Sequence, residues 1–597
     1  MEIFPHCPVA HHFGGNASMK LEPGSELWYS NVEAPECISD LDGAQWDAEA
    51  DFVVVGYGGA GISAALQAAE NGLQVLAVDA FAGGGATAMN GGIFYAGGGT
   101  AVQRKAGVVD SPDDMFRYLS LEVADVVRPA TLRRFCDGSV ADLEWLAGHG
   151  VRFDSTYYPK KTFYPPAGYF LYHSDSSLAE TCAAVAAPAA RGHKYWHPPA
   201  SQPTGFGVHL TDPLRQRGAQ LGVRFWARTE ARNLIVSASG EVVGVRVVRM
   251  PEDSVHTTAY IDAQEKARAL LQKLPSSMPG FARLERKAQA YWQKARALQQ
   301  QHGVVQRIKA RRGVCLSAGG FIWNQQMVSA YAPKYVSNMA MGSPGGDNGS
   351  GIRLGQSVGG EAALMNRVSS WRFINPPTQW PKGVLVNMQG QRFVNEELYG
   401  ASIGHEMNEY HQGKGYIILD RTLYRGAWKT AVLENLFPFM RLPLVLALLF
   451  QTRKGRTIEA LAKKIGMPPA ALQETVNRYN HAAEGGQRDD FGKSRSECQA
   501  LRSGPFYAID VSASSKFFPC SAMTVGGLRI DEDTGEVLRE DRTPIRGLYA
   551  AGRTAIGLPS NLYVSGLSAA DCVFSGRRAA QHASNANADA AVRLVEM

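Results

Sequence analysis

The sequence predicts an α/β protein in which a domain built on a parallel β-sheet is interrupted by a long insertion. Residues 51–80 follow the order strand, glycine-rich loop, helix, strand, which is the order of a βαβ unit. Short strands and glycine turns return at 505–590, after a long mixed segment. The chain has 597 residues, too many for one compact core, so two or more domains are expected.

These patterns divide the chain into successive stretches. Residues 1–47 show little periodicity and are expected to form an irregular N-terminal extension. The sheet domain is expected at 48–330 and again at 505–597, with the inserted domain at 331–504 between them. Two strong helix-forming runs, separated by Pro, Ser and Gly, predict a helical hairpin at 253–303 between two strands.

The glycine-rich loop has the form G-x-G-x-x-G in the required place between a strand and a helix. Gly56 permits a sharp turn, Gly58 lets the backbone approach a pyrophosphate, and Gly61 lets the helix pack closely on the strand. The free N–H groups of the helix N-terminus favour a phosphate. Asp79 ends the second strand, where a ribose hydroxyl would be held. We therefore predict a dinucleotide site that includes Gly56, Gly58, Gly59, Ala60, Gly61 and Asp79.

A second glycine cluster follows at 83–92. A nicotinamide enzyme does not need it, whereas a flavin enzyme needs backbone alongside both the pyrophosphate and the isoalloxazine, with Thr87 offering a hydroxyl. A strand-like piece at 547–553 ends in Gly552-Arg553 and suits a return to the same cofactor. FAD is therefore the predicted cofactor, with further contacts expected from Gly85, Ala86, Thr87, Gly91 and Gly92.

Composition excludes several other classes. Charged residues make up 19% and the net charge is +6, with no block of Lys and Arg, so nucleic acid is not a favoured partner. Eight scattered cysteines without a Cys-x-x-Cys pair, and a start without a basic and then apolar segment, favour reduced thiols and a cytoplasmic protein. His193 and His197 have metal-like spacing, but the prolines after them argue against a shared helix face, so no metal site is predicted.

Two apolar stretches leave alternatives open. The run 436–450 is too short and too interrupted to span a bilayer, and we expect a buried helix. The alternative is a surface that dips into a membrane, helped by the basic residues that follow, so that 436–456 makes a peripheral contact. The aromatic-rich stretch 153–172 either lines an apolar substrate cleft or packs in an ordinary core.

Several motifs carry a resemblance to a known family. They are VVVGYGGAG, the GGGAT stretch, CLSAGGF (315–321), GDNGSGIRLG (346–355), GQRFVNE (390–396), GPFYAI (504–509), TVGGLRID (524–531) and GLYAAGR. In this order they resemble the flavoprotein family of soluble fumarate reductases and 3-ketosteroid dehydrogenases. The resemblance implies a discontinuous Rossmann-like FAD-binding domain, an inserted α+β cap domain that carries substrate and catalytic groups, and an active site between them. It also implies cofactor contacts from Gly319, Asp347, Gly552, Arg553, Gly566 and Leu567.

Two positions separate the members of this family. Fumarate reductases place an arginine shortly after RFVNE and another in the C-terminal motif. Here Glu397-Leu398-Tyr399-Gly400 and Ser560–Ser568 contain none. Two carboxylates in a closed site need cationic partners, so a dicarboxylate substrate is disfavoured.

Tyrosines at the same positions suggest ketone chemistry. A ketone needs a hydrogen-bond donor at its oxygen, a base for the neighbouring C–H and a flavin for the hydride. The motif S-N-x-Y-V-S-G-L-S closely resembles that of 3-ketosteroid Δ4-(5α)-dehydrogenases, which implies that Tyr563 and Ser565 are catalytic. Residues two apart in an extended segment share a side, so both would face the substrate. Tyr399 is the expected third member, and Tyr416 is its rival.

The resulting hypothesis is an FAD-dependent dehydrogenase that removes a proton from carbon 4 and a hydride from carbon 5 of a saturated 3-ketosteroid. Tyr563 with Ser565 would act at carbon 4, and Tyr399 would sit near the ketone or relay the proton. An external electron acceptor is required, and no nicotinamide site is evident. The alternatives are a 3-ketosteroid Δ1-dehydrogenase, a flavin-dependent enone reductase, and a flavin-containing membrane-docking or binding protein.

Overall fold

The computed structural model describes residues 31–595 apart from 42, 199–204, 275, 277 and 435. Most of the predicted irregular extension, residues 1–30, lies outside this range. The described end of that extension is not wholly irregular, because β1 (Glu36–Ile38) pairs in parallel with β9 (Thr229–Ser237). The regular structure therefore begins earlier than the sequence pattern indicates.

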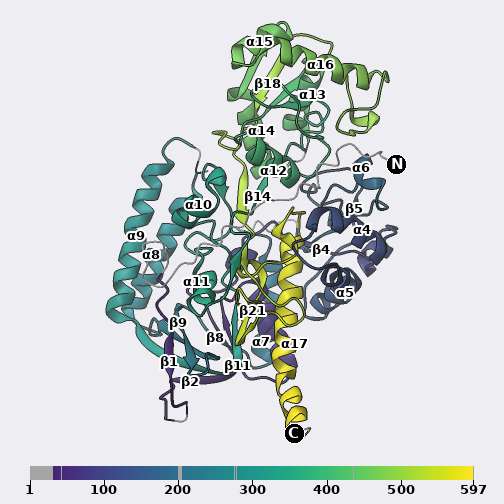
Figure 1. Cartoon of the computed structure of the whole chain (residues 1–597). Coiled ribbons are helices and arrows are strands. Elements are labelled where there is room, and N and C mark those ends of the chain that lie inside the picture. Colours follow the sequence, from purple (N-terminus) through teal and green to yellow (C-terminus); the bar gives the residue numbers. More distant parts are fainter. Residues whose placement is uncertain are drawn as a thin grey trace.

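A nine-stranded mixed sheet forms the lower body of the molecule (Figure 1). Its path runs β1-β9-β10-β11-β2-β3-β8, and β22 with β21 attaches along β11. At its centre β2 (Ala48–Val55), α1 (Gly59–Glu70) and β3 (Val75–Val78) form the βαβ unit, with β2 and β3 parallel neighbours. The other strands are β8 (Arg224–Trp226), β10 (Val242–Arg249), β11 (Val304–Leu316), β21 (Glu536–Leu538) and β22 (Pro544–Ala550).

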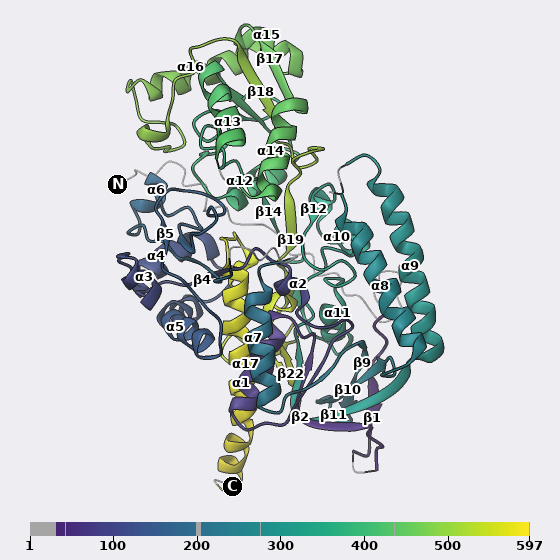
Figure 2. The same ribbon diagram turned by 180° about the vertical axis from the view of Figure 1, so that it is seen from behind.

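The two faces of this sheet enclose separate cores. Along β2, Phe52 and Val54 belong to one core cluster, while Val53 and Val55 belong to another, as the alternation of a strand requires. The long helix α17 (Leu567–Val595) packs against α1 on the first face, and Figure 2 shows the two together with α7 (Val208–Gln220). Helices α10 (Gln325–Tyr331) and α11 (Ser350–Ser357) contribute to the second core. The N-terminus of α1 is thereby held at the end of β2.

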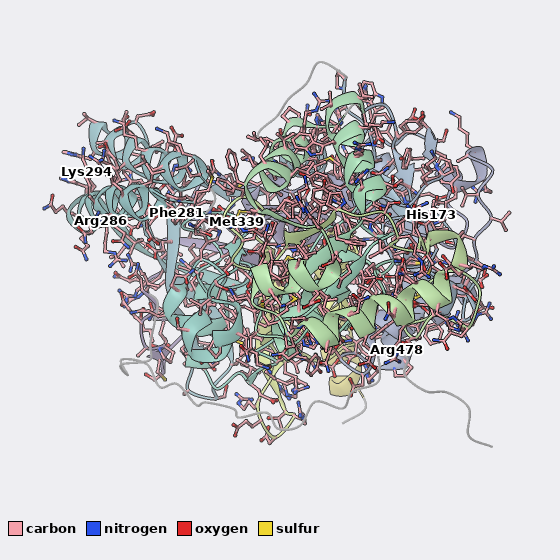
Figure 3. All side chains as sticks on the ribbon, turned by 90° about the horizontal axis from the view of Figure 1, so that it is seen from above. His173, Phe281, Arg286, Lys294, Met339 and Arg478 are labelled. Atoms are coloured by element: carbon pink, nitrogen blue, oxygen red, sulfur yellow. The ribbon has the colours of Figure 1, made fainter. Side chains whose placement is uncertain are left out.

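Two helices extend from the sheet as a hairpin at one side of the body (Figures 1 and 3). They are α8 (Val255–Gln272) and α9 (Phe281–His302), and Figure 3 shows Phe281, Arg286 and Lys294 on the second of them. The hairpin joins β10 to β11, which are adjacent antiparallel strands.

The upper lobe in Figure 1 is a four-stranded antiparallel sheet with helices around it. Its strand order is β15-β16-β18-β17, and β18 (Phe506–Asp510) pairs with both β16 and β17. The predicted boundary at 504/505 therefore falls too early, since a strand just beyond it completes this sheet. The remaining elements of the lobe are β15 (Val384–Val386), β16 (Tyr416–Leu419), β17 (Thr452–Gly455), α12 (Gly400–Tyr410), α13 (Arg421–Leu433), α14 (Pro438–Phe450), α15 (Ile458–Ile465) and α16 (Pro469–Ala483).

Smaller elements link the two bodies. Residues 93–194 supply a four-stranded sheet, and a three-stranded sheet of β12, β19 and β14 lies below α12 (Figure 2). The elements are β4 (Ile93–Tyr95), β5 (Tyr157–Tyr158), β6 (Leu171–Tyr172), β7 (Gly192–Lys194), β12 (Met339–Ala340), β13 (Ala362–Ala363), β14 (Val368–Trp371), β19 (Ser521–Thr524), β20 (Gly527–Leu528), α2 (Gly85–Ala88), α3 (Ala101–Lys105), α4 (Pro112–Val123), α5 (Pro129–Gly148) and α6 (Glu180–Ala183).

Helix α14 corrects the expectation of a buried helix over the run 436–450. Met440, Leu444, Ala447 and Leu448 are buried, but the opposite face is not. Exposed large apolar side chains on this helix are Phe439, Leu442, Leu449 and Phe450. Within the described part of the chain, no helix has both the length and the apolar character needed to cross a membrane.

Candidate active site

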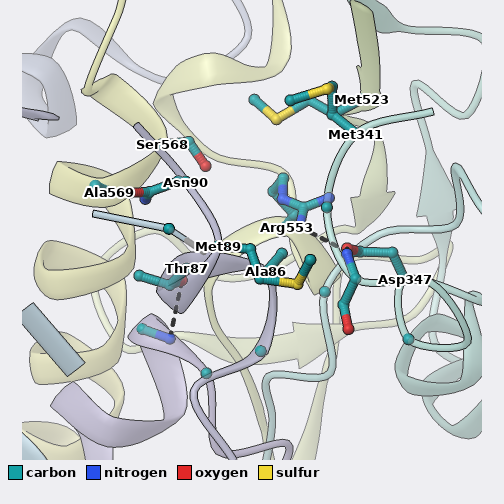
Figure 4. Close-up of a pocket in the computed structure, with 18 of the residues that line it drawn as sticks. Ala86, Thr87, Met89, Asn90, Met341, Asp347, Met523, Arg553, Ser568 and Ala569 are labelled. Atoms are coloured by element: carbon teal, nitrogen blue, oxygen red, sulfur yellow. Dashed lines mark hydrogen bonds and ion pairs between the residues drawn. The ribbon is translucent and has the colours of Figure 1, made fainter. Parts of the chain in front are cut away.

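A cavity of about 750 Å³ extends from the glycine loop of the lower body to aromatic side chains that reach down from the upper lobe. Figure 4 shows part of its wall, where α2, the start of α17 and the loop with Asp347 meet. Segments as distant in sequence as 55–60 and 551–572 line it. The predicted cofactor residues that line it are Gly56, Gly58, Gly59, Ala60, Asp79, Gly85, Ala86, Thr87, Gly91, Gly319, Asp347, Gly552, Arg553 and Gly566.

The glycine loop and the second glycine cluster lie against each other. The backbone N–H of Gly59 donates to Thr87 Oγ1 over 3.1 Å (Figure 4), and a methyl group added at Gly58 would lie 3.8 Å from Gly85 Cα. Gly56 has φ +96°, which favours glycine. The N-terminus of α1 therefore opens on the cavity with little side-chain cover, as a phosphate requires.

Three predicted cofactor residues do not line the cavity. Gly61 packs inside the turn, where a Cβ would lie 2.0 Å from the carbonyl oxygen of Gly56. Gly92 has φ +74° and packs against Phe206, and Leu567 is a buried residue at the start of α17. Their place in the fold is structural support beside the cavity.

The Asp79 carboxylate is held by two backbone N–H groups of neighbouring loops. One carboxylate oxygen accepts from the N–H of Tyr57 and the other from the N–H of Phe81, both over 2.8 Å. Burial raises the pKa of Asp79, and these two N–H donors act in the opposite direction. The carboxylate thus lies at the cavity wall in a fixed orientation, with lone pairs left for a ribose hydroxyl.

Arg553 and Asp347 form a buried ion pair over 2.6 Å (Figure 4). Asp347 also accepts from the N–H of Gly320. Arg553 Nη1 is buried and has no hydrogen-bond partner among the described residues. An unpaired donor on a cavity-lining guanidinium suits a cofactor with acceptor oxygens or ring nitrogens, so the residues here fit a flavin dinucleotide.

Hydroxyl groups gather at the far part of the cavity. Tyr172 donates to Ser565 Oγ over 3.3 Å, and the hydroxyls of Tyr399 and Ser565 are also hydrogen-bonded to each other. The N–H of Gly566 donates to the phenol oxygen of Tyr563 over 3.4 Å. The structure therefore brings together Tyr399, Tyr563 and Ser565, the three predicted catalytic residues. Tyr416, the rival of Tyr399, lies on β16 and does not line the cavity.

Burial governs the acidity of these phenols. It raises the pKa of Tyr563 to about 12, and the Gly566 N–H and the charge of Arg553 act against it. Burial also raises the pKa of Tyr399, the neighbouring Tyr563 and Tyr172 act in the same direction, and the hydrogen bond with Ser565 acts against them. Of the two, Tyr563 has the surroundings that better stabilise a phenolate.

Aromatic rings enclose the hydroxyl cluster. Trp371 lies with its ring centroid 5.3 Å from that of Tyr563, and Phe373 lies 5.6 Å from Tyr399. Phe163 stacks on Phe373 at 4.1 Å. Of the aromatic stretch 153–172, Phe163 and Tyr164 line the cavity, while other members pack in cores. Trp371 and Phe373 carry no motif, and sequence reasoning missed them as it missed the role of Tyr172.

Three guanidinium groups line the cavity, and each of them has a partner within the protein itself. Arg553 pairs with Asp347, and Arg372 donates to Cys520 Sγ and to the carbonyl oxygen of Ser512. The third, Arg268, belongs to the helical hairpin. Within the described ranges no cluster of His, Cys, Asp and Glu could hold a metal ion, and His193 is hydrogen-bonded to Thr100 and to the carbonyl of Arg191.

Comparisons with known proteins agree with this geometry. Residues 51–563 match the family described as FAD binding domain. The chain is 36% identical to a 3-oxo-5-alpha-steroid 4-dehydrogenase of Comamonas testosteroni, over 86% of this chain and 94% of that protein. It is 26% identical to a 3-oxosteroid 1-dehydrogenase of Mycolicibacterium smegmatis, over 86% of this chain and 93% of the relative.

Solved structures give the same result. The 3-ketosteroid Δ4-(5α)-dehydrogenase of Rhodococcus jostii, crystallised with 4-androstene-3,17-dione, has a TM-score of 0.75 and 29% sequence identity, with 92% of this chain and 99% of that chain covered. The 3-ketosteroid Δ1-dehydrogenase of Sterolibacterium denitrificans has a TM-score of 0.62 at 20% identity, with 90% and 100% covered, and supports the fold alone.

Proposed function

The chain belongs to the FAD binding domain family of flavoproteins, with FAD as its cofactor, and from this premise we propose that it oxidises saturated 3-ketosteroids by forming the double bond between carbons 4 and 5. The observation that carries the proposal is the hydroxyl cluster of Tyr399, Ser565 and Tyr563 inside an aromatic wall. It lies in the same cavity as the glycine loop. The split of the chain into an FAD domain and an inserted cap belongs to the same proposal.

The residues divide the work according to their surroundings. Tyr399, whose pKa burial raises and which has no cation among the causes that act on it, donates to the ketone oxygen and so acidifies the C–H at carbon 4. Tyr563 receives that proton, because the Gly566 N–H and the Arg553 charge favour its phenolate. Ser565, bonded to Tyr399 and Tyr172, orients the cluster and relays the proton. FAD, when bound, supplies the hydride acceptor for carbon 5.

The electrostatics of the wall favour a neutral ketone over a dicarboxylate. The guanidinium groups of Arg372 and Arg553 already have acceptors within the protein. The rings of Trp371, Phe373, Phe163 and Phe439 also line the cavity, and they suit an apolar ring system.

The test is anaerobic addition of a saturated 5α-3-ketosteroid to the purified flavoprotein. Bleaching of the oxidised flavin band, with a product that carries a double bond at carbons 4 and 5 by NMR, supports the proposal. A product with the double bond at carbons 1 and 2 replaces it by the Δ1 activity. If a 4-en-3-one reoxidises the reduced flavin but the saturated ketosteroid does not reduce the oxidised flavin, the protein is an enone reductase and the proposed dehydrogenase activity is wrong. No bleaching with any 3-ketosteroid removes the steroid assignment.

We also infer that the exposed face of α14 contacts a lipid surface from which the substrate enters. Phe439, Met440 and Pro443 line the cavity, while Leu442 and Phe450 on the same helix are 61% and 58% exposed. Val432 and Leu433 at the end of α13 add to this apolar surface. Exposed cations lie on α13, on α14 itself and on β17, namely Arg425, Lys429, Arg441, Arg453 and Lys454. An apolar face with basic flanks fits an anionic bilayer, and a sparingly soluble steroid partitions there.

A further inference from the structure

The helical hairpin of α8 and α9 is not needed to connect the strands at its base. Arg249 at the end of β10 pairs directly with Val304 at the start of β11, so a tight turn would suffice there. The hairpin has a small core of its own around Tyr260, Ala263 and Ala295. The hairpin therefore forms a small separate unit, and the residues that it contacts are the guide to its function.

The inner side of the hairpin touches segments that line the cavity. Trp292 of α9 packs edge-on against Phe81 with ring centroids 6.1 Å apart. A Cβ added at Gly345 would lie 2.3 Å from the Trp292 ring, so indole and loop are in direct contact. Phe81 follows the predicted ribose-binding Asp79, and Gly345 belongs to the loop that carries Asp347. One side chain therefore connects both loops of the cofactor region.

Arg268 of α8 reaches the cavity itself. Its guanidinium lies 5.2 Å from the centre of the Phe81 ring and donates to Ser343 Oγ over 3.3 Å. It also contacts Met89 Sδ in the second glycine cluster. Through the Arg268 guanidinium, the hairpin thus contacts three separate segments of the cavity wall.

The charge of Arg268 lacks a full counter-charge. Among the described residues it forms no ion pair within 4.0 Å. Burial lowers the pKa of Arg268, the charge of Arg228 lowers it further, and Asp79 and Glu265 act in the opposite direction. Two guanidinium groups held near each other in a partly buried place are stabilised when an anion joins them. The pyrophosphate of a dinucleotide bound in this cavity would supply such an anion.

We propose that the hairpin is a clamp on the adenosine diphosphate half of FAD, in which Arg268 binds the cofactor and Trp292 fixes the two loops around it. The clamp rests on FAD binding and is independent of which substrate is oxidised. It gives the insertion a role in cofactor retention.

The test compares Arg268→Gln with Arg286→Gln, a matched loss of charge on the exposed side of α9. Apoprotein of each variant is titrated with FAD by flavin fluorescence and with ADP by calorimetry, without any steroid. Loss of a charge-assisted contact predicts that both dissociation constants rise about tenfold or more in Arg268→Gln. They stay within about twofold of wild type in Arg286→Gln, since that side chain is exposed and does not line the cavity. The wild-type constants also rise more steeply with added salt than those of Arg268→Gln.

Equal affinities of the two variants for FAD and ADP would overturn the clamp. A measurement on the wild-type chain tests the clamp independently. Hydrogen exchange of the α8 amides at 264–272 should slow when FAD is added to the apoprotein. Unchanged exchange there also overturns it. Neither result bears on steroid oxidation, which is measured separately by flavin bleaching.

Discussion

The phenol of Tyr172 donates to Ser565 Oγ across 393 positions of sequence, and the same serine is hydrogen-bonded to Tyr399. Ser565 is therefore held from two sides, by β6 and by the start of α12. Its hydroxyl cannot rotate freely without losing one partner. This places a fixed relay beside Tyr563, from which the following expectations arise.

Tyr563→Phe should slow proton removal strongly while leaving the cofactor in place. The variant loses one oxygen and keeps the ring that lies beside Trp371. General base catalysis contributes about 10²–10⁴ in rate, so kcat should fall by that factor. Stopped-flow reduction of the bound flavin measures it, and the flavin-to-protein ratio is the control. Near-normal turnover would remove Tyr563 from the mechanism.

The pH dependence should report the high pKa of Tyr563. Burial raises this pKa to about 12, so at neutral pH the base form is scarce and increases about tenfold per pH unit. The logarithm of kcat/KM should then rise steadily between pH 7 and 10 without reaching a plateau. Tyr399→Phe should lower the whole profile but keep this slope. A plateau near pH 8 would mean that another group accepts the proton.

Two glycines of the same loop should fail in different ways. Gly58→Ala leaves the apoprotein intact, because the added methyl lies 3.8 Å from its nearest neighbour, but it intrudes where the cofactor lies. Gly61→Ala places a methyl 2.0 Å from the Gly56 carbonyl and should destabilise the fold itself. Thermal melting of the apoproteins and FAD titration separate these effects. Equal melting temperatures for the two variants would contradict the packing role of Gly61.

Glu122 should make the protein less stable as pH rises. Burial raises its pKa to about 7 against a partial opposing effect of the Tyr118 hydroxyl. The folded state therefore holds its proton longer than the unfolded state, and stability is lost between the two pKa values as pH increases. A shift of this size corresponds to at most about 3 kcal/mol. Urea denaturation at pH 4.5 and 8 should show Glu122→Gln gaining stability relative to wild type at the higher pH. A difference that does not depend on pH would disprove the assignment.

The apolar face of α14 should bind anionic vesicles. Leu442→Glu removes an apolar anchor worth about 1.5–3 kcal/mol, so vesicle partitioning should drop about tenfold or more. Val109→Glu, at another exposed valine, should partition like wild type. Sedimentation with vesicles of phosphatidylserine and phosphatidylcholine gives the fractions. Identical behaviour of both variants would show that α14 is not the contact.

Local patterns predicted the βαβ unit well, because loop, helix and acidic residue are contiguous in sequence. The motif around Tyr563 and Ser565 likewise named residues that line the cavity, and their catalytic role stays a prediction. Tyr172 could not be recognised, since its bond to Ser565 depends on how β6 meets the start of α17. In the sequence, Arg268 cannot be distinguished from an exposed cation on a helix. Only the packing of the hairpin shows that it lines the cavity. Helix α14 was expected to be buried because apolar composition does not reveal which face lacks a partner.

The assembly of the central sheet has a consequence for biosynthesis. β11 is flanked by β2 from the beginning of the chain and by β22 from its end, and Arg553 and Gly566 follow β22. A ribosome must therefore release nearly the whole chain before the cofactor meets a complete cradle. Flavin loading is a late event, after translation of the last strand, and truncated chains that end before β22 emerge as apoproteins.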